Sequence, residues 1–472
     1  MRNRSCKIVA TVGPASSSPS MIELLHRTGV DVFRLNYSHG NHDALSAVVD
    51  AIRATEQKAG SPIAILADLQ GPKIRVGSFP GDGLKLPFQG TFRLTAQDTA
   101  GADEIPVPHP EVISVLEEGD ILKFDDGRIQ MSVVEKTDSG VIVRADVPGT
   151  LKSKKGLNLP GRALPISALT EKDHRDLEHA LGCGVDVVAL SFVQRSNDII
   201  EAKEKVQGRA RVIAKIEKPC AVDDLDDIIS HADGLMVARG DLGVELPPEQ
   251  VPGIQRRIVA KARQAGKPVI VATHMLESMI EETAPTRAEA SDIATAVSQG
   301  TDAVMLSAET AVGRHPATAV AIMDRIIFAT ENDPDPIPIA SATSDAEDLT
   351  TADAVTLSAR RITEVIDVRF ALAYTKSGST ARRLSRDRPN CPIIAATPSE
   401  DVARSLAIQW GTTPVVTDDI THFHDMLAKA ASVARSFGAK EGERIITLAG
   451  YPFGRPGKTN TLKISRIGEE ND

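Results

Sequence analysis

Two carboxylates and a lysine stand where apolar runs end in the middle of the chain. Lys215 and Glu217 close the run RVIAKIE, and Asp241 follows the run GLMVARG. Magnesium takes oxygen ligands, and in phosphotransferases it is held by one or two carboxylates together with the phosphates of the substrate. A lone acid at such a place is usually a solvated turn residue, so the combination with Lys215 carries the inference. The pattern predicts a magnesium-phosphate site in which Glu217 and Asp241 are the metal ligands.

Eight runs rich in Val, Ile, Ala and Leu have the length of strands and alternate with segments of helix length. They cover residues 7–13, 30–37, 63–69, 186–192, 211–217, 234–240, 268–273 and 303–307. Continuous apolar strands that alternate with helices are typical of a parallel sheet buried on both faces, and eight of them predict an α/β fold built on a (β/α)8 TIM barrel. The active site of that fold lies at the C-terminal ends of the strands. Polar side chains stand at six of these ends: Arg34, Asn36, Ser38, Asp68, Lys215, Glu217, Arg239, Asp241, Thr273, Ser307 and Glu309.

The alternation of apolar runs with helical segments is interrupted twice, which predicts two further domains. The stretch 73–167 is rich in Gly, Pro and Asp turns with short β-like runs, and it is far longer than an ordinary connection, so we expect an inserted β-domain. A Pro/Asp/Ser linker at 331–345 precedes a second alternation of apolar runs and helical segments, which predicts a C-terminal α/β domain. The expected domains are therefore the barrel at 1–72 and 168–340, the insert at 73–167 and the C-terminal domain at 341–472.

Composition limits the class of protein. The 472 residues include 64 acidic and 54 basic side chains, and the net charge of −10 disfavours a general nucleic-acid or membrane-surface role. The four cysteines lie far apart and form no C-x-x-C pair, so neither a zinc site nor a disulfide framework is expected. No apolar run reaches 18 residues, and the apolar stretch at the N-terminus is too short for a signal peptide. We expect a cytoplasmic enzyme that binds neither nucleic acid nor membrane.

Nine motifs, in order along the chain, carry a resemblance to a known family. They are KIVATVGPASSS, FRLNYSHG, GPKIR, KKGLNLPG, AKIEKP, MVARGDLGVEL, VATHMLESM, APTRAEASDIA and GTDAVMLSAETAVG. With them the chain resembles the pyruvate kinase family over nearly its whole length. The resemblance implies a barrel, an inserted lid and a C-terminal domain assembled as a homotetramer, with phosphoenolpyruvate and ADP as substrates.

The resemblance also implies roles for the residues at the strand ends. Lys215 would contact the phosphoryl group in transit, while Glu217 and Asp241 would hold Mg²⁺, or Mn²⁺ in its place. Arg34 is similar to the family's phosphate-binding arginine, and Thr273 resembles the residue beside the enolate carbon that gains a proton. Transferred charge spreads over the phosphoryl oxygens, so such groups act by position and electrostatics.

The amides of Gly240 and Asp241 would receive the substrate carboxylate if a helix begins there.

Several of the strand-end residues also have plain structural interpretations. Arg34 would otherwise form a salt bridge across the barrel mouth, and Thr273 would cap the helix that follows it. For Ser307 and Glu309 a structural and a functional role have equal weight, since both suit the first turn of a helix.

Nucleotide contacts follow from the resemblance alone. The lid motif KKG-x-NLPG faces the nucleotide in the family, which makes Lys155 a candidate for an ADP-phosphate contact, and Arg75 matches a position at the root of the lid. The full set that the resemblance implies is Asn36, His39, Arg75, Lys155 and Ser307.

The motif GPKIR departs from the GP-E-IR of members that bind potassium, because Lys73 stands in place of the glutamate. An ammonium group is a compact point charge on a flexible stem and can replace a monovalent cation. Leu69, Gln70 and Val76 also differ from the Thr, Lys and Thr that potassium-dependent members carry. We therefore expect that potassium is not required. The cation site, or its replacement, comprises Asn36, Ser38, Asp68, Leu69 and Lys73.

A second phosphate site is expected in the C-terminal domain. The segment AYTKSGSTARRL follows an apolar run and opens a helical one, so amides and hydroxyls there are placed to cradle a phosphate. An ordinary helix cap at Ser379 is the plain alternative. The resemblance favours a phosphorylated small-molecule activator, with Arg455 or Lys458 assisting. The loop residues concerned are Thr375, Ser377, Ser379 and Thr380.

Two other functions remain open from the sequence. Another barrel enzyme that forms the pyruvate enolate, such as an aldolase or a lyase, would also place Glu and Asp around magnesium. A metabolite sensor without catalytic activity would keep the fold. The insert, Lys215 and the cluster of Arg34, Asn36 and Ser38 favour the kinase over the first, and the intact Lys215, Glu217 and Asp241 argue against the second.

Overall fold

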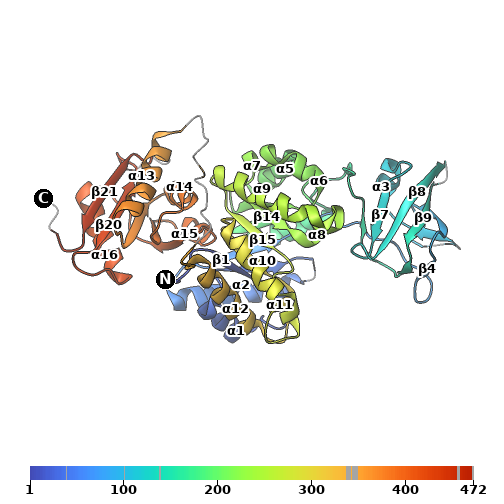
Figure 1. Ribbon diagram of the computed structural model, residues 1–472, viewed down its shortest axis with the longest axis horizontal. Coiled ribbons are helices and arrows are strands. Elements are labelled where there is room, and N and C mark those ends of the chain that lie inside the picture. Colours follow the sequence, from blue (N-terminus) through green and yellow to red (C-terminus); the bar gives the residue numbers. More distant parts are fainter. Residues whose placement is uncertain are drawn as a thin grey trace.

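Three bodies lie in a row in the computed structural model, with the barrel in the middle (Figure 1). The C-terminal domain lies at one end and the inserted β-domain at the other, so each packs against a different end of the barrel. The structure describes residues 1–38, 40–99, 101, 103–137, 140–335, 342, 349–453 and 458–469.

The central body is a closed barrel of parallel strands in the order β1-β16-β15-β14-β13-β12-β3-β2. Every residue of β1, β3, β12, β14, β15 and β16 is buried, which explains why these strands read as continuous apolar runs. The fold class expected from the sequence is therefore confirmed. The strands are β1 (Lys7–Val12), β2 (Val32–Asn36), β3 (Ala64–Asp68), β12 (Val187–Leu190), β13 (Arg211–Ile216), β14 (Gly234–Ala238), β15 (Val269–Ala272) and β16 (Ala303–Leu306).

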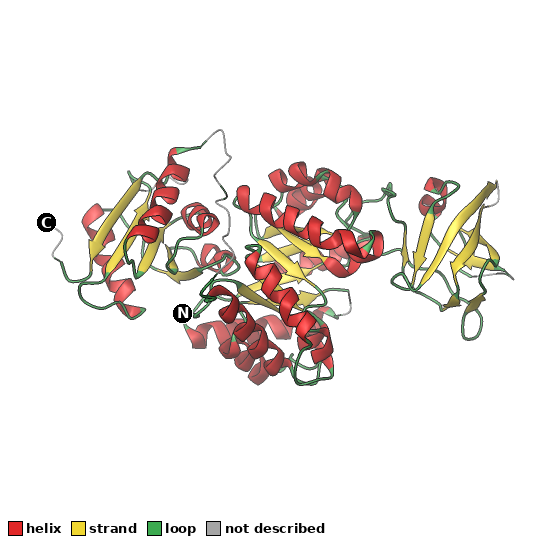
Figure 2. Ribbon diagram, viewed as in Figure 1, coloured by secondary structure: helices red, strands yellow, loops and turns green. Residues whose placement is uncertain are grey.

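Helices surround this barrel (Figure 2). Several begin at a residue that caps the first turn with its side chain: Thr170 and Asp173 form a reciprocal capping box at α4, and Thr286 and Glu289 form another at α10. The helices of the barrel are α1 (Pro19–Thr28), α2 (His42–Ala59), α4 (Glu171–Gly182), α5 (Ser196–Val206), α6 (Pro219–Asp223), α7 (Leu225–His231), α8 (Arg239–Glu245), α9 (Val251–Gln264), α10 (Arg287–Ser298), α11 (Ala308–Ala311) and α12 (Pro316–Glu331), with the 3-10 turns η1 (Pro248–Gln250) and η2 (Glu277–Ile280).

Between β3 and α4 the chain forms the β-domain. It has a six-stranded sheet in the order β11-β7-β8-β9-β5-β6 and a two-stranded sheet of β10 and β4, around a core that includes Phe92, Phe124 and Met131. Two hydrogen bonds join it to α8: Lys123 Nζ donates to the Val244 carbonyl at 2.6 Å, and Asn158 Nδ2 donates to Glu245 Oε1 at 2.8 Å. Its elements are β4 (Leu84–Leu86), β5 (Thr91–Thr95), β6 (Glu104–Pro106), α3 (Pro110–Val115), β7 (Ile121–Phe124), β8 (Ile129–Thr137), β9 (Gly140–Val147), β10 (Gly149–Leu151) and β11 (Leu157–Asn158).

The C-terminal domain is a five-stranded sheet in the order β19-β18-β17-β20-β21, in which only β21 runs antiparallel to its neighbour among the described strands. Most of the expected linker lies outside the described residues, and the exact domain boundaries stay a prediction. The elements are α13 (Thr351–Val365), β17 (Phe370–Tyr374), α14 (Ser379–Asp387), β18 (Ile393–Thr397), α15 (Glu400–Leu406), β19 (Thr412–Val416), α16 (Phe423–Ser436), β20 (Arg444–Ala449) and β21 (Thr461–Arg466).

The C-terminal domain closes the end of the barrel where the strands begin. Ala407 and Ile408, which follow α15, belong to the same buried cluster as the inward-facing residues of the barrel strands. Beside them Arg388 donates to Asp302 at 3.1 Å, with both side chains 4% exposed, and stacks on Trp410 at 4.6 Å. Asp302 directly precedes β16, so this buried ion pair joins the two domains.

Arg388→Met should destabilise the contact between the domains, because it leaves the Asp302 carboxylate buried without its cation. Breaking such a pair costs about 3–5 kcal/mol. Trp410 is the single tryptophan and lies under Arg388, so its fluorescence during urea unfolding reports on this contact. Arg361→Met is the matched control, since Arg361 is 72% exposed on α13. Equal unfolding midpoints for the two variants would contradict the prediction.

Candidate active site

Asp68 brings two cations together at the end of β3. Its carboxylate is 2% exposed and accepts hydrogen bonds from Arg34 Nε at 2.7 Å and from Lys215 Nζ at 3.1 Å. Burial alone would raise the pKa of Asp68, but Lys215 and Arg34 outweigh it and the pKa is lowered. Strands β2 and β3 are consecutive and pair with each other, and β13 is brought to the same side because β12, which follows the inserted domain, pairs with both β3 and β13.

Lys215 lies between two buried carboxylates. Its Nζ is 2.9 Å from Glu217 Oε1 and donates to Ser191 Oγ at 2.6 Å, and the side chain is 11% exposed. Burial would lower the pKa of Lys215, yet Asp68 and then Glu217 more than offset that effect, so its pKa is raised. The amine is therefore held as an ammonium ion at the barrel mouth, which makes it a fixed positive charge and unsuited to act as a base.

Glu217 is 1% exposed and is held from two sides. Oε2 accepts the backbone N–H of Phe192 at 2.7 Å, while Oε1 faces Lys215. Phe192 has a φ of 54°, a left-handed conformation that costs free energy in a residue with a bulky side chain. Burial raises the pKa of Glu217; Lys215 lowers it in part, and the neighbouring carboxylate of Asp241 raises it again.

The two carboxylates fit a magnesium ion. Glu217 and Asp241 repel each other, and the Asp241 carboxylate has no hydrogen bond or ion pair with any residue that the structure describes. A hard divalent cation between them would relieve this repulsion. No group of three or more His, Cys, Asp or Glu that could hold a metal occurs in the described part of the chain, so further ligands would come from water and substrate.

The turn after β15 is strained and rigidly held. Thr273 and His274 have φ of 72° and 54°, two successive left-handed residues without a glycine. Arg239 Nη2 donates to the Thr273 carbonyl at 2.7 Å, and its Nη1 pairs with Asp292 at 2.6 Å. Arg239, which the strand-end pattern singled out, therefore positions this turn.

Thr273 also accepts a hydrogen bond from one of the two amides that are expected to bind the substrate carboxylate. The Gly240 N–H donates to Thr273 Oγ1 at 2.7 Å, and the hydroxyl in turn donates to the Ala272 carbonyl at 2.6 Å. A substrate carboxylate would therefore compete with Thr273 for the Gly240 amide. The amide of Asp241 has no such internal partner among the described residues.

The expected cation site is only partly assembled from polar atoms. Asn36 Oδ1 accepts the N–H of Ser38 at 3.1 Å, while Leu69 is 1% exposed and presents an apolar side chain. Lys73 is half-buried, and within the described residues its ammonium has no hydrogen bond or ion pair. A Cβ added to Gly156 would lie 3.5 Å from Lys73 Cε, which places the lysine side chain against the β-domain.

The residues expected to contact a nucleotide are spread over both bodies. Lys155 lies in the β-domain, where its Nζ pairs with Asp125 at 2.6 Å, and Arg75 Nη1 donates to the Lys154 carbonyl at 2.9 Å. Ser307 Oγ is buried without a partner in the described structure. His39 lies outside the described residues.

Glu309 has a structural role in this arrangement. It is 1% exposed, and its oxygens accept the N–H of Leu276 at 3.1 Å and of Ser307 at 2.6 Å. Burial raises the pKa of Glu309, and these amides offset the effect in part. The carboxylate thus ties the turn after β15 to the turn after β16.

Comparisons with known proteins agree with this geometry. The family described as pyruvate kinase, barrel domain, matches residues 3–320, and the family described as pyruvate kinase, alpha/beta domain, matches residues 353–465. The chain belongs to the pyruvate kinase family. A pyruvate kinase from Methylorubrum extorquens is 48% identical over 472 residues, covering 100% of this chain and 99% of the relative.

Other members of the pyruvate kinase family agree over similar lengths. A pyruvate kinase from Mycobacterium intracellulare is 41% identical over 474 residues, covering 99% of this chain and 100% of the relative. The crystal structure of a pyruvate kinase from Cryptosporidium parvum superimposes with a TM-score of 0.93 at 32% identity, covering 98% of this chain and 96% of that one.

The C-terminal loop at residues 375–380, called the effector loop below, encloses little space. Its hydroxyls pair with one another and with a neighbour: Ser377 Oγ with Ser379 Oγ at 3.2 Å and Thr380 Oγ1 with Thr459 Oγ1 at 2.7 Å. The Thr375 N–H is bonded to the Ala396 carbonyl, so only its hydroxyl, which is buried without a partner, remains available. The cavity is about 60 Å³, and Lys458 lines it. Arg455 lies outside the described residues.

One contact at the barrel mouth was not expected from the sequence. Ser191 Oγ accepts a hydrogen bond from the Lys215 ammonium and donates one to the Leu69 carbonyl at 2.6 Å. Ser191 is the next-to-last residue of the run 186–192, so a polar strand end was present in the sequence there too. No described helix is long and apolar enough to cross a membrane.

Proposed function

We propose that this chain transfers the phosphoryl group of phosphoenolpyruvate to ADP, giving pyruvate and ATP, at the mouth of the barrel. The observation that supports this most is the ammonium of Lys215, held between the buried carboxylates of Asp68 and Glu217. Together with Arg34 it would place two cations against a phosphoryl group, where the transition state spreads negative charge over the equatorial oxygens.

In this proposal an oxygen of the ADP β-phosphate attacks phosphorus, and the bond from phosphorus to the enol oxygen breaks. Lys215 and Arg34 bind the phosphoryl oxygens throughout. Glu217 and Asp241 would hold Mg²⁺, or Mn²⁺, which supplies positive charge to the phosphates. The enolate left behind takes a proton at its methylene carbon, and Thr273 orders the water that delivers it, because its own hydroxyl is too weakly acidic.

The remaining groups would bind the substrates. The Gly240 and Asp241 amides would donate to the substrate carboxylate, with Thr273 giving up the hydrogen bond that it accepts from Gly240. Asn36, His39, Arg75, Lys155 and Ser307 would contact the nucleotide, which requires the β-domain to approach the barrel. We further propose a cytoplasmic homotetramer, as the family resemblance implies.

Lys215→Met should lower turnover by on the order of 10²–10³-fold, the scale for losing one preorganised charge at a transition state. Binding of phosphoenolpyruvate should change far less, since Arg34 remains. The assay is formation of ATP from ADP and phosphoenolpyruvate, which an aldolase or lyase would not give. Lys205→Met on the exposed face of α5 is the control. Near-normal turnover of the Lys215 variant would refute its role.

Potassium should not be required, because the ammonium of Lys73 supplies the unit charge. The measurement is wild-type turnover with tetramethylammonium as the only monovalent cation, before and after potassium is added at fixed ionic strength. Activation above about tenfold, or roughly 1.4 kcal/mol of barrier, would contradict this. Lys73→Glu should create potassium dependence, whereas Lys85→Glu, an exposed residue of β4, should not.

A phosphorylated activator should act through the effector loop. We expect a sugar phosphate or AMP to lower the half-saturating concentration of phosphoenolpyruvate, and Ser377→Ala combined with Ser379→Ala to abolish the effect. Ser358→Ala on the exposed face of α13 is the matched control. An unchanged saturation curve with every such compound would exclude the proposal. The cavity of about 60 Å³ admits little more than a phosphate group, so the loop must open for the rest of the molecule.

A further inference from the structure

A second cavity lies under the barrel, between the starts of its strands and the C-terminal domain. Its volume is about 450 Å³. We call it the basal cavity; the residues that matter here are Arg211, Asp233 and Lys267 of the barrel and Asp353, Arg382 and Arg386 of the C-terminal domain. Arg211 begins β13, so this cavity lies at the opposite end of the barrel from Lys215.

Positive charge exceeds negative charge in the basal cavity. Five cationic side chains face two carboxylates: Arg211, Lys267, Arg382, Arg383 and Arg386 face Asp233 and Asp353. Each of these two carboxylates already pairs with two cations. Asp353 accepts Arg386 at 3.0 Å and Arg383 at 3.2 Å, and Asp233 pairs with Lys203 at 3.0 Å and Arg211 at 3.8 Å. Arg382 and Lys267 form no ion pair with either carboxylate, and Asp233 acts on them only from a distance through its charge.

Arg382 and Lys267 have only carbonyl oxygens as partners within the described residues. Arg382 Nη2 donates to the Ser377 carbonyl at 2.7 Å, and Lys267 Nζ donates to the Ala232 carbonyl at 2.7 Å. Burial, followed by the charge of Arg211, lowers the pKa of Arg382 to about 10, and burial also lowers the pKa of Lys267. The charge of Asp233 offsets these effects in part. Both ions are half-buried and have no ion pair within the described residues, an arrangement that a bound anion would stabilise.

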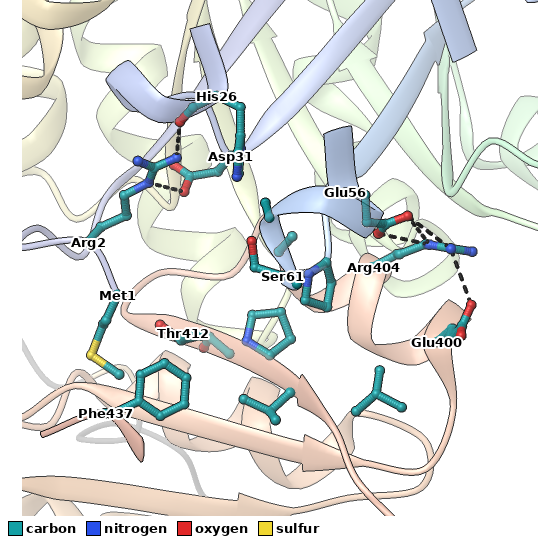
Figure 3. Close-up of a pocket in the computed structure, with 18 of the residues that line it drawn as sticks. Met1, Arg2, His26, Asp31, Glu56, Ser61, Glu400, Arg404, Thr412 and Phe437 are labelled. Carbon is teal, nitrogen blue, oxygen red and sulfur yellow. Dashed lines mark hydrogen bonds and ion pairs between the residues drawn. The ribbon is translucent and has the colours of Figure 1, made fainter. Parts of the chain in front are cut away.

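A neighbouring cavity at the same domain boundary shows the contrast. There Arg2 pairs with Asp31 at 3.5 Å, and Arg404 pairs with Glu56 at 2.9 Å and with Glu400 at 3.2 Å (Figure 3). Both of these arginines have a carboxylate partner, unlike Arg382, whereas the buried Lys7 in the same lining donates to the Thr412 carbonyl at 2.7 Å.

We propose that the basal cavity binds a small phosphate-bearing anion, with Arg382 and Lys267 as its principal ligands. A guanidinium keeps a planar fork of donors that matches phosphate oxygens, and one donor to Ser377 leaves the others available. The volume suits a small metabolite. Because Lys267 belongs to the barrel and Arg382 to α14, the anion joins the two domains.

The basal cavity is separate from the effector loop but touches it from below. Arg382 supports the Ser377 carbonyl, and Ser379 lines both spaces. Gly378, with a φ of 82°, lets the guanidinium approach: a Cβ there would lie 2.5 Å from Arg382 Nη1. An anion in the basal cavity therefore binds the guanidinium that positions the effector loop, and this goes beyond the activator site proposed above.

The test is titration of the full-length protein with inorganic phosphate, replacing chloride at constant ionic strength, followed by calorimetry and by thermal unfolding. We expect Lys267→Met and Arg382→Met each to weaken one phosphate site at least tenfold and to reduce the phosphate-dependent rise in Tm. Arg325→Met, a matched loss of charge at an exposed position of α12, should titrate like the wild type. Lys458→Met, which alters only the effector-loop cavity, should keep the basal site.

Two results would overturn the inference. In one, Lys267→Met and Arg382→Met titrate like Arg325→Met, so that no phosphate binds between the domains. In the other, Lys458→Met abolishes the site that Lys267→Met leaves intact, so that phosphate binds the effector loop alone. Lys267 has no hydrogen bond or ion pair with the effector loop among the described residues and does not line the effector-loop cavity, so its variant separates the basal site from the activator proposal.

Discussion

A buried carboxylate that must be paired organises the mouth of this barrel. Asp68 is taken out of water at the end of β3, and an ion in that position is tolerated only with cations and donors around it. Arg34 and Lys215 meet that requirement, and both are thereby fixed with their charges toward the opening. The barrel interior below is apolar, so these charges cannot relax inward. Preorganised charge of this kind is what phosphoryl transfer needs.

Helix α8 connects the side of the mouth where we propose the metal ligands to the β-domain. Asp241 stands in its first turn, and at its other end the Glu245 carboxylate and the Val244 carbonyl accept hydrogen bonds from Asn158 and Lys123 of the β-domain. Movement of the β-domain therefore acts on the helix that carries a proposed metal ligand. Lys218, 3.4 Å from Glu245, connects the same helix to the turn after β13.

At the other end of the barrel, the C-terminal domain closes the apolar interior and also lines the cavities at the boundary between the two domains. Ala407 and Ile408 complete the apolar interior, and the Arg388–Asp302 pair holds the contact. Around this sealed centre lie cavities with different charge balances. Where the charges are paired, the contact is structural; where cations are in excess, at Arg382 and Lys267, the boundary between the domains has the properties of an anion site.

The sequence alone determined the barrel, the eight strand positions and the residues at their ends, because a buried parallel strand is a local apolar run whose last residues must face the opening. Lys215, Glu217 and Asp241 could be chosen in this way. Tertiary structure decided the rest. That Ser191 contacts Lys215 and that Thr273 occupies the Gly240 amide depends on left-handed turns, which local pattern does not reveal. The unpaired charge beneath the barrel joins Lys267 and Arg382, residues more than a hundred positions apart, and only domain packing decides which charges find partners.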